Sequence, residues 1–167
     1  VLGVGHDITA RKQIEETLRL TDERSRTLAA MLRLMCDNVP DMIWAKSLDK
    51  RYMFANKALC EDLLCARDVK EPLGKTDLFF ARREREKHPE DAHWHTFGEI
   101  CQETDDEALR SNRATQFDES GYVRGPFICL DVHKAPLFDD QGRVIGVVGS
   151  ARNVTAHKAA QEKLLLA

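Results

Sequence analysis

The chain has 167 residues, of which 43% are hydrophobic and 32% are charged, and its formal net charge is −3. This length suits one domain of ordinary size with an extension, and the apolar share is sufficient for a buried core. The charge balance gives no basic surface for nucleic acid, and no apolar run approaches the roughly 20 residues that span a bilayer. We therefore expect no nucleic acid partner and no direct contact with a membrane.

The cysteines indicate a reducing compartment. They are odd in number and widely spaced, and none forms a CxxC pair or has zinc-ligand spacing with a histidine: Cys36, Cys60, Cys65, Cys101 and Cys129. This pattern predicts reduced thiols and a cytoplasmic location. Because the chain begins with Val1 and has no signal peptide, we expect it to be part of a longer protein. Whether that protein is anchored in a membrane elsewhere stays open.

The C-terminal third predicts two long strands joined by a tight turn. The strands are expected at about 126–137 and at 144–153, because both are rich in β-branched and aromatic residues. Between them, residues 139–142 read Asp-Asp-Gln-Gly, in which Gly142 can adopt a positive φ. Gly146 and Gly149 lie within the second strand and leave room for a close approach to the sheet. Thr155 is predicted to cap the helix that follows.

The middle of the chain predicts shorter elements. Strands are expected at 42–46 and 51–55, and Asn56 is expected to cap a helix over 57–64. A loop and short helix follow at 72–80, with the sequence PLGKTDLFF. A further helix is predicted over 104–111, with Thr104 as its cap and Glu107 completing a capping box. A strand that begins at 115–118 is expected in the centre of the sheet.

These motifs, taken in order, resemble a PAS domain. The similar features are MIWAKSLDKRYMFANKAL at 42–59, the GKTD element, the D-x-x-G turn, and the ending G-x-x-G-x-x-x-N-V-T at 146–155. The family usually has Asp where this chain has Asn153. The resemblance implies an α+β fold: a five-stranded antiparallel sheet with flanking helices and a long N-terminal linker helix. It places the PAS domain at 38–155 and the start of a C-terminal linker helix at 156–167.

An internal echo extends the resemblance to the N-terminus. Residues 1–12 align without gaps to 147–158, with identities that include Gly3 with Gly149 and Thr9 with Thr155. We therefore expect 1–9 to be the last strand of a preceding PAS domain, with Thr9 capping a linker helix over 10–37. Thr9, Asn153 and Thr155 are the predicted joints between sheet and helix, and replacing either threonine with alanine is expected to uncouple input from output. The family implies a sensory or dimerisation module of a multidomain bacterial signalling protein. By resemblance, its output domain is a histidine kinase of a two-component system or a diguanylate cyclase.

The expected linker helix has a heptad pattern. Residues at alternating spacings of four and three are apolar near both ends of the helix and polar at its centre, at Thr21 and Ser25. Two interpretations stay open: an amphipathic helix that packs on its own domain, and a parallel two-stranded coiled coil in a homodimer. We predict the coiled coil, with Ile14, Leu18, Leu28 and Leu32 as its contact residues.

The sequence gives no support for a cofactor or for catalysis. Flavin-binding photosensors of the family carry G-x-N-C-R-F-L-Q, whereas this chain has FANKALCEDLL around Asn56. The candidate haem ligands His88, His93 and His95 precede the helix expected to hold such a ligand. His93 and His95 are two residues apart, so on a helix they would point in different directions. With no phosphate loop or nucleophile motif either, we expect no haem, flavin or metal, and no enzyme.

A small-molecule pocket is the remaining candidate site. Two alternating sets of residues occupy opposite faces of the strand at 126–136, and the sequence alone does not say which set faces inward. The candidate pocket residues are Trp44, Phe54, Phe117, Phe127, Cys129, Asp131 and His133. Three functions stay open: a ligand-binding sensor, a structural spacer with a filled core, and a small ligand-binding enzyme domain.

Overall fold

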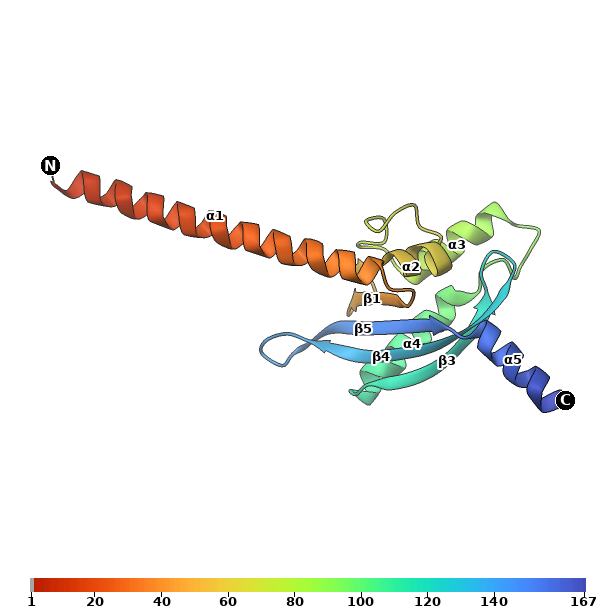
Figure 1. Cartoon of the computed structure of the whole chain (residues 1–167). Coiled ribbons are helices and arrows are strands. Elements are labelled where there is room, and N and C mark those ends of the chain that lie inside the picture. The colour runs from red at the N-terminus through yellow and green to blue at the C-terminus, as the bar shows by residue number, and fades with distance from the viewer. Residues whose placement is uncertain (1) are drawn as a thin grey trace. The chain divides into compact units, whose positions relative to one another are not determined.

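The computed structural model describes the backbone of residues 2–167 and the side chains of residue 5 and of residues 7–167. The chain divides into two units, residues 1–36 and residues 37–167, which are described separately (Figure 1). The first unit consists of helix α1, which spans Leu2–Asp37 and so ends at the first residue of the second unit. The second unit contains the remaining elements.

Helix α1 begins earlier than the sequence predicts. The strand expected over 1–9 is wrong for the described residues, because Leu2–Thr9 are helical; Val1 lies outside them. A strand needs neighbouring strands for its backbone hydrogen bonds, whereas a helix satisfies its own. Thr9 is therefore not a cap: its hydroxyl donates to the carbonyl of Gly5, one turn earlier, at 3.0 Å. The preceding domain itself stays a prediction.

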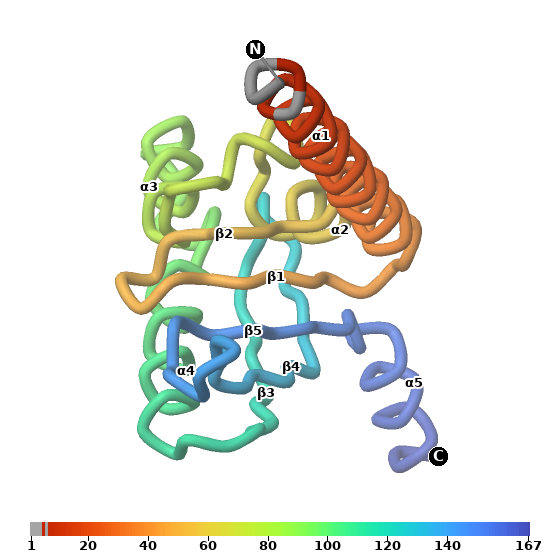
Figure 2. Tube along the Cα trace, turned by 90° about the vertical axis from the view of Figure 1, so that its left-hand side faces the viewer, coloured from red at the N-terminus to blue at the C-terminus, as the bar shows by residue number. Residues whose placement is uncertain are grey.

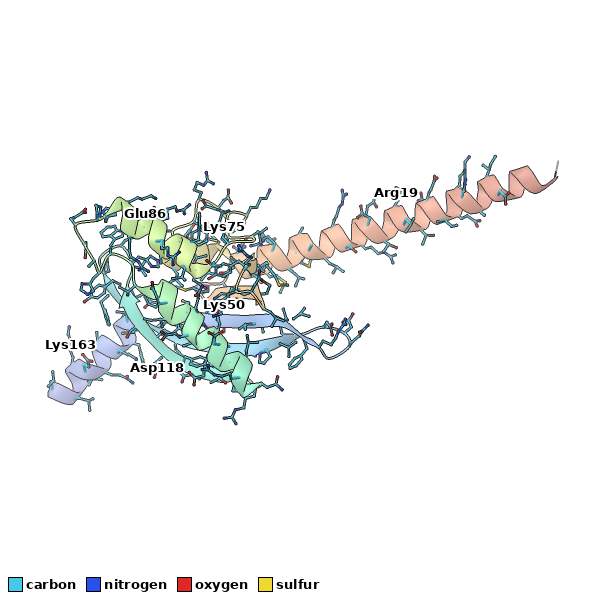
Figure 3. The ribbon with its side chains drawn as sticks, turned by 180° about the vertical axis from the view of Figure 1, so that it is seen from behind. Arg19, Lys50, Lys75, Glu86, Asp118 and Lys163 are labelled. Atoms are coloured by element: carbon cyan, nitrogen blue, oxygen red, sulfur yellow. The ribbon has the colours of Figure 1, made fainter. Side chains whose placement is uncertain are left out.

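The surface of α1 is solvated and carries ion pairs along its length. Arg19 stands out from the helix in Figure 3 and pairs with Glu16 at 2.7 Å and with Glu23 at 2.6 Å. Such pairs at spacings of three and four stabilise an isolated helix by a few tenths of a kcal/mol each. They support a long helix without requiring that it pack against the domain.

A five-stranded antiparallel sheet forms the second unit, with the strand order β2-β1-β5-β4-β3. The α+β architecture is therefore confirmed. The strand predicted to be central, now β3, lies at the edge of the sheet, and β5 lies at its centre. The bounds are β1 Met42–Ser47, β2 Tyr52–Ala55, β3 Thr115–Tyr122, β4 Phe127–Phe138 and β5 Val144–Asn153.

The helices between the strands pack on one face of this sheet, which we call the inner face (Figure 2). They are α2 (Lys57–Leu59), which continues into a π-helical turn η1 (Cys60–Leu64), α3 (Asp77–Lys87) and α4 (Phe97–Ser111). Asn56 caps α2 as predicted, since its side chain accepts from the amide of Leu59 at 3.1 Å. Helix α5, Thr155–Leu166, follows directly from β5.

Helix α4 starts seven residues before the predicted helix. The predicted cap, Thr104, lies in the middle of α4, where its hydroxyl oxygen is 3.1 Å from the carbonyl oxygen of Ile100, one turn earlier. A Ser or Thr followed three residues later by Glu also occurs in the interior of helices, so this pattern alone does not locate a helix start. The start is instead near Thr96, whose hydroxyl accepts from the amide of Tyr122 on β3 at 2.9 Å.

Two glycines of the C-terminal hairpin behave as predicted. Gly142 has φ +78° in the turn between β4 and β5, a conformation that side chains disfavour. At Gly149 the indole ring of Trp44 lies against the backbone, and a Cβ there would come within 2.5 Å of a ring carbon. The close approach expected at this strand glycine is therefore a contact with the protein's own tryptophan.

Candidate functional site

The structure decides which face of β4 points to the interior. Leu130, Val132 and Lys134 are buried on the inner face, whereas Phe127 and His133 are exposed on the other face. Because side chains alternate along a strand, Cys129 and Asp131 share the outer face with them. The candidate list is therefore corrected: Phe127, Cys129, Asp131 and His133 do not line the interior.

The aromatic candidates divide between the two faces. Trp44 is only 5% exposed and belongs to the core on the inner face. Phe117 pairs with the inward-facing Val132 and packs against the same core. Phe54 pairs with Ala45, the neighbour of Trp44, which places it on the outer face. Only Trp44 and Phe117 of the predicted residues thus face the helices.

The interior instead contains a cluster of buried charges that the sequence analysis missed. We call it the ion cluster: Lys46, Asp77, Asp105, Glu119 and Lys134, each no more than 4% exposed. Two lysines come from β1 and β4, one carboxylate from β3, and the other two from α3 and α4. The ion cluster therefore joins the sheet to the two helices that cover it.

Asp105 is the central carboxylate of the ion cluster. One of its oxygens lies 2.7 Å from the ammonium of Lys46, and the other lies 2.7 Å from that of Lys134. Lys46 also contacts Asp77 at 2.6 Å, and Lys134 contacts Glu119 at 3.3 Å. Both ammonium groups lie near the indole ring of Trp44, at 5.9 and 5.8 Å from its centroid.

Neutral groups complete the hydrogen bonding. Lys134 donates to the carbonyl of Cys101 at 3.0 Å and to the hydroxyl of Thr104 at 2.7 Å. The hydroxyl of Thr104 in turn contacts Glu119, and the hydroxyl of Tyr52 donates to Asp77. These bonds allow α4 to place the partly buried Thr104 and the buried Asp105 on the side that faces the sheet.

The electrostatics keep the lysine charged and its neutral neighbours uncharged. Burial alone would lower the pKa of Lys46, but the carboxylates of Asp77 and Asp105 outweigh it and raise that pKa. Burial, reinforced by Asp77, raises the pKa of both Tyr52 and Cys101 well above their ordinary values. With three carboxylates and two ammonium groups, the ion cluster carries one net negative charge in its fully ionised form.

The space left at the ion cluster is small. An interior cavity of about 10 Å³ lies between the inner face and the helices. Pockets for drug-sized ligands occupy roughly 300–1,000 Å³, and about 10–15 Å³ is needed for one water molecule. The fold's interior is therefore filled mainly by its own side chains, and a larger ligand would have to displace them.

A second polar contact joins the sheet to the exit helix. We call it the β4–α5 joint: Cys129, Asn153, Val154 and Thr155. The hydroxyl of Thr155 accepts from the amide of Cys129 on β4 at 2.9 Å and donates to the side chain of Asn153 at 2.6 Å. The amide of Val154 donates to the carbonyl of Cys129 at 2.9 Å.

The predicted capping role of Thr155 is wrong, although its place at the start of the helix is right. The cap position is Val154, which has no side-chain cap, and Thr155 is the first helical residue. The oxygen of Asn153 accepts from the amide of Thr155 at 3.0 Å, so Asn153 supplies the acceptor for this N-terminal amide. Thr155 then uses its hydroxyl to hold β4.

Neither metal binding nor membrane insertion has a structural counterpart in the described part of the chain. No group of three or more His, Cys, Asp or Glu side chains there is arranged to hold a metal ion. None of the helices formed by the described residues combines the length and apolarity needed to cross a bilayer.

One of the three histidines considered as haem ligands is buried. His95 is 1% exposed, and its Nε2 lies 2.7 Å from the carbonyl of Leu63. Since a carbonyl only accepts, Nε2 carries the proton, and Nδ1 is buried without a hydrogen-bond partner among the described residues. Burial lowers the pKa of His95 below its usual 6.5, and the Leu63 bond opposes this only in part.

His95 should make the folded chain less stable in acid. Below about pH 6.5 the unfolded chain binds a proton at His95 while the folded chain does not, so the free energy of unfolding falls as the pH drops toward the lower folded pKa. We expect His95→Gln to remove this part of the pH dependence in urea melts from pH 7.5 to 5. The matched control is the exposed His93→Gln. Equal slopes in wild type and His95→Gln would contradict the assignment.

Comparison with known proteins places this geometry in a family. A family model described as PAS fold matches residues 36–159. The aerobic respiration control sensor protein ArcB of Escherichia coli (strain K12) is 26% identical over 139 residues, which cover 81% of this chain and 16% of that protein. The chain thus spans a small part of the length of this relative.

Solved structures show the same fold at low identity. The PAS domain of a Colwellia psychrerythraea protein has a TM-score of 0.53 and 12% identity, over 77% of this chain and 98% of that chain. The PAS domain of Bordetella pertussis BvgS has a TM-score of 0.50 and 19% identity, over 82% and 94%. A Vibrio cholera VqmA–ligand–DNA complex has a TM-score of 0.56 and 18% identity, over 71% and 47%.

Proposed function

Because the chain belongs to the PAS fold family, as a PAS domain of a signalling protein, we propose that it relays signals between neighbouring domains and dimerises through α1. The observation that carries the proposal is the β4–α5 joint, where a strand of the sheet is hydrogen bonded to the first residue of the exit helix. A change in the sheet reaches α5 through this contact. The neighbouring domains would be a PAS domain before α1 and a histidine kinase or diguanylate cyclase after α5.

Dimerisation is supported by the apolar stripe on α1. Ile14, Leu18, Leu28 and Leu32 are each 60–64% exposed on the single chain. Burying an exposed leucine or isoleucine contributes roughly 1.5–3 kcal/mol, and two parallel copies of α1 would bury this stripe at the heptad positions. The centre of the stripe should contribute less to dimerisation, because Thr21 is polar there. Its hydroxyl donates to the carbonyl of Thr17 in its own helix and not to a second copy of α1.

We expect the wild-type chain to be a parallel homodimer in solution, and the double variant Leu18→Glu/Leu28→Glu to be a monomer. Light scattering at about 100 μM is suitable, because the dimer population depends on protomer concentration. The matched control is Arg19→Glu/Arg26→Glu, which changes charge on the same helix away from the stripe. A wild-type monomer, or a dimer that survives both leucine substitutions, would contradict the coiled coil.

A small-molecule input is the second candidate, supported by the polar interior and by the ligand named in the VqmA complex. A ligand larger than water that entered the interior would have to displace members of the ion cluster, because the cavity there holds about 10 Å³. A melting-temperature screen with metabolites separates a sensor from a structural spacer, since a ligand that binds the folded state raises the melting temperature. If no compound in the screen raises the melting temperature, the result favours the structural spacer.

We also propose a cytoplasmic location. Cys65, Cys101 and Cys129 are free thiols, and such thiols persist in reducing compartments. Accessible-thiol labelling of the native parent protein in intact and permeabilised cells tests this proposal. Labelling in intact cells by a reagent that does not cross membranes would contradict it.

A further inference from the structure

The interior cavity is lined partly by polar side chains, and some of their hydrogen-bond donors and acceptors are not used by the described residues. The residues around it include Trp44, Lys46, Tyr52, Asp77 and Glu119, together with apolar side chains such as Leu59 and Leu130. Its volume of about 10 Å³ is at the threshold for one water molecule. An apolar cavity of this size would stay dry, whereas a polar one is occupied when two to four partners are available.

The first unused partner is the indole N–H of Trp44. The side chain is 95% buried, and its Nε1 has no hydrogen-bond partner among the described residues. The indole nitrogen is only a donor, so it requires an acceptor. A buried donor left without one costs about 1–3 kcal/mol. The nearby ammonium groups of Lys46 and Lys134 cannot accept this proton.

Acceptor capacity is available on the carboxylates of the same cavity. One oxygen of Glu119 accepts from the hydroxyl of Thr104 and lies 3.3 Å from the ammonium of Lys134. Among the described residues, the other oxygen contacts the thiol of Cys101 at 3.8 Å, which is a weak donor. Asp77 uses each oxygen once, for Tyr52 and for Lys46, and each ionised oxygen can accept a second bond. The lining thus offers an unused donor and unused acceptors around one water-sized space.

We propose that this cavity binds a single structural water molecule, which accepts from Nε1 of Trp44 and donates to the carboxylate of Glu119 or Asp77. Water fits because it both accepts and donates. A metal cation does not fit, because the ammonium group of Lys46 lines the same space, and an organic ligand exceeds the volume. The water links β1 to the carboxylates of β3 or α3, and gives a reason for tryptophan rather than phenylalanine at position 44.

Crystal structures of the whole chain and of Trp44→Phe test this proposal. In the wild type we expect one isolated density peak in the cavity, within about 2.7–3.2 Å of Nε1 and of a carboxylate oxygen. In Trp44→Phe, which keeps an aromatic ring but removes the donor, the peak should be lost or displaced from position 44. Density that is absent from the wild type, or that does not contact Nε1, would overturn the proposal.

A solution measurement keeps the proposal testable if the variant does not fold. The chain has two tryptophans, so the indole N–H signals of the wild type are few and can be told apart by a Trp94→Phe variant. Trp94 is the matched control, because its Nε1 already bonds to Glu84 at 3.3 Å. We expect a cross-relaxation signal from a long-lived water at Trp44. Its absence would overturn the proposal and leave the proposed relay function untouched.

Discussion

Replacing Lys46 with methionine should lower the free energy of unfolding by about 3–5 kcal/mol, because breaking a buried ion pair leaves its partner charge uncompensated. Lys46 is the lysine that contacts Asp77, at 2.6 Å, and it shares Asp105 with Lys134. Without it, three buried carboxylates share one ammonium group. For a domain of this size the melting temperature should fall by on the order of 10–20 °C.

Lys50→Met is the matched control for this substitution. Lys50, labelled in Figure 3, follows the same strand and pairs with Asp106 at 2.8 Å, but both side chains are partly exposed. Exposed pairs contribute about 0–1 kcal/mol. The two variants therefore compare the same chemical change in a buried and a solvated pair. Similar losses in urea melts of Lys46→Met and Lys50→Met would contradict the role assigned to the ion cluster.

Asp105→Asn should cost less than Lys46→Met, although Asp105 lies at the centre of the ion cluster. Its removal leaves two lysines, Asp77 and Glu119, so the charges balance, and the amide oxygen can still accept one bond. Comparing the loss in free energy of unfolding between the two variants therefore tests whether the net charge of the ion cluster matters more than the central place of the residue in it. A larger loss in Asp105→Asn would mean that the bridging geometry matters more than the net charge.

Part of the ion cluster could have been predicted from the spacing of its charged residues along the strands and along α4. Lys46 follows Met42 and Trp44 at a spacing of two, and Lys134 follows Leu130 and Val132 in the same way. On α4, Asp105 stands four residues after Cys101, on the buried side. Charged residues that keep the period of an apolar face indicate buried ion pairs. That signal was present, but which lysine meets which carboxylate depends on contacts between elements far apart in the chain.

The strands and the turn could be predicted because their signals are local. The strand predicted from Val144 to about Asn153 spans Val144–Asn153, and the turn at Gly142 has the predicted positive φ. The inward face of β4 could not be predicted, because both alternating sets mix apolar and polar side chains. Phe127 and His133 were chosen for their chemistry, whereas burial selects the set of Leu130 and Val132, which pack against the core.

The N-terminal echo shows the limit of sequence similarity as a guide to secondary structure. Residues 1–9 match the end of β5 and the start of α5, but Leu2–Thr9 are helical. β5 is a strand because β1 and β4 pair with it on both sides. The same residue pattern at Leu2–Thr9 pairs with no strand among the described residues, and it forms part of α1.

We expect Thr155→Ala to leave the fold intact but to uncouple stimulus from output in the full-length parent. The substitution removes the acceptor for the amide of Cys129 and should cost about 1–3 kcal/mol. Allosteric coupling energies are typically about 1–3 kcal/mol, so loss of this bond is comparable with the signal that it would transmit. The measurement is output activity of the parent with and without stimulus, beside a melting curve of this chain.

Two further variants distinguish the β4–α5 joint from a general loss of stability. Thr155→Ser keeps the hydroxyl that holds Cys129 and donates to Asn153, so its stimulus response should match the wild type. Thr9→Ala removes a hydroxyl that bonds only within α1, to Gly5, and should leave the response unchanged. If Thr155→Ala responds like the wild type while its melting temperature falls, the signal does not pass through this contact. If Thr9→Ala also abolishes the response, sensitivity to threonine loss is not specific to the joint between sheet and exit helix.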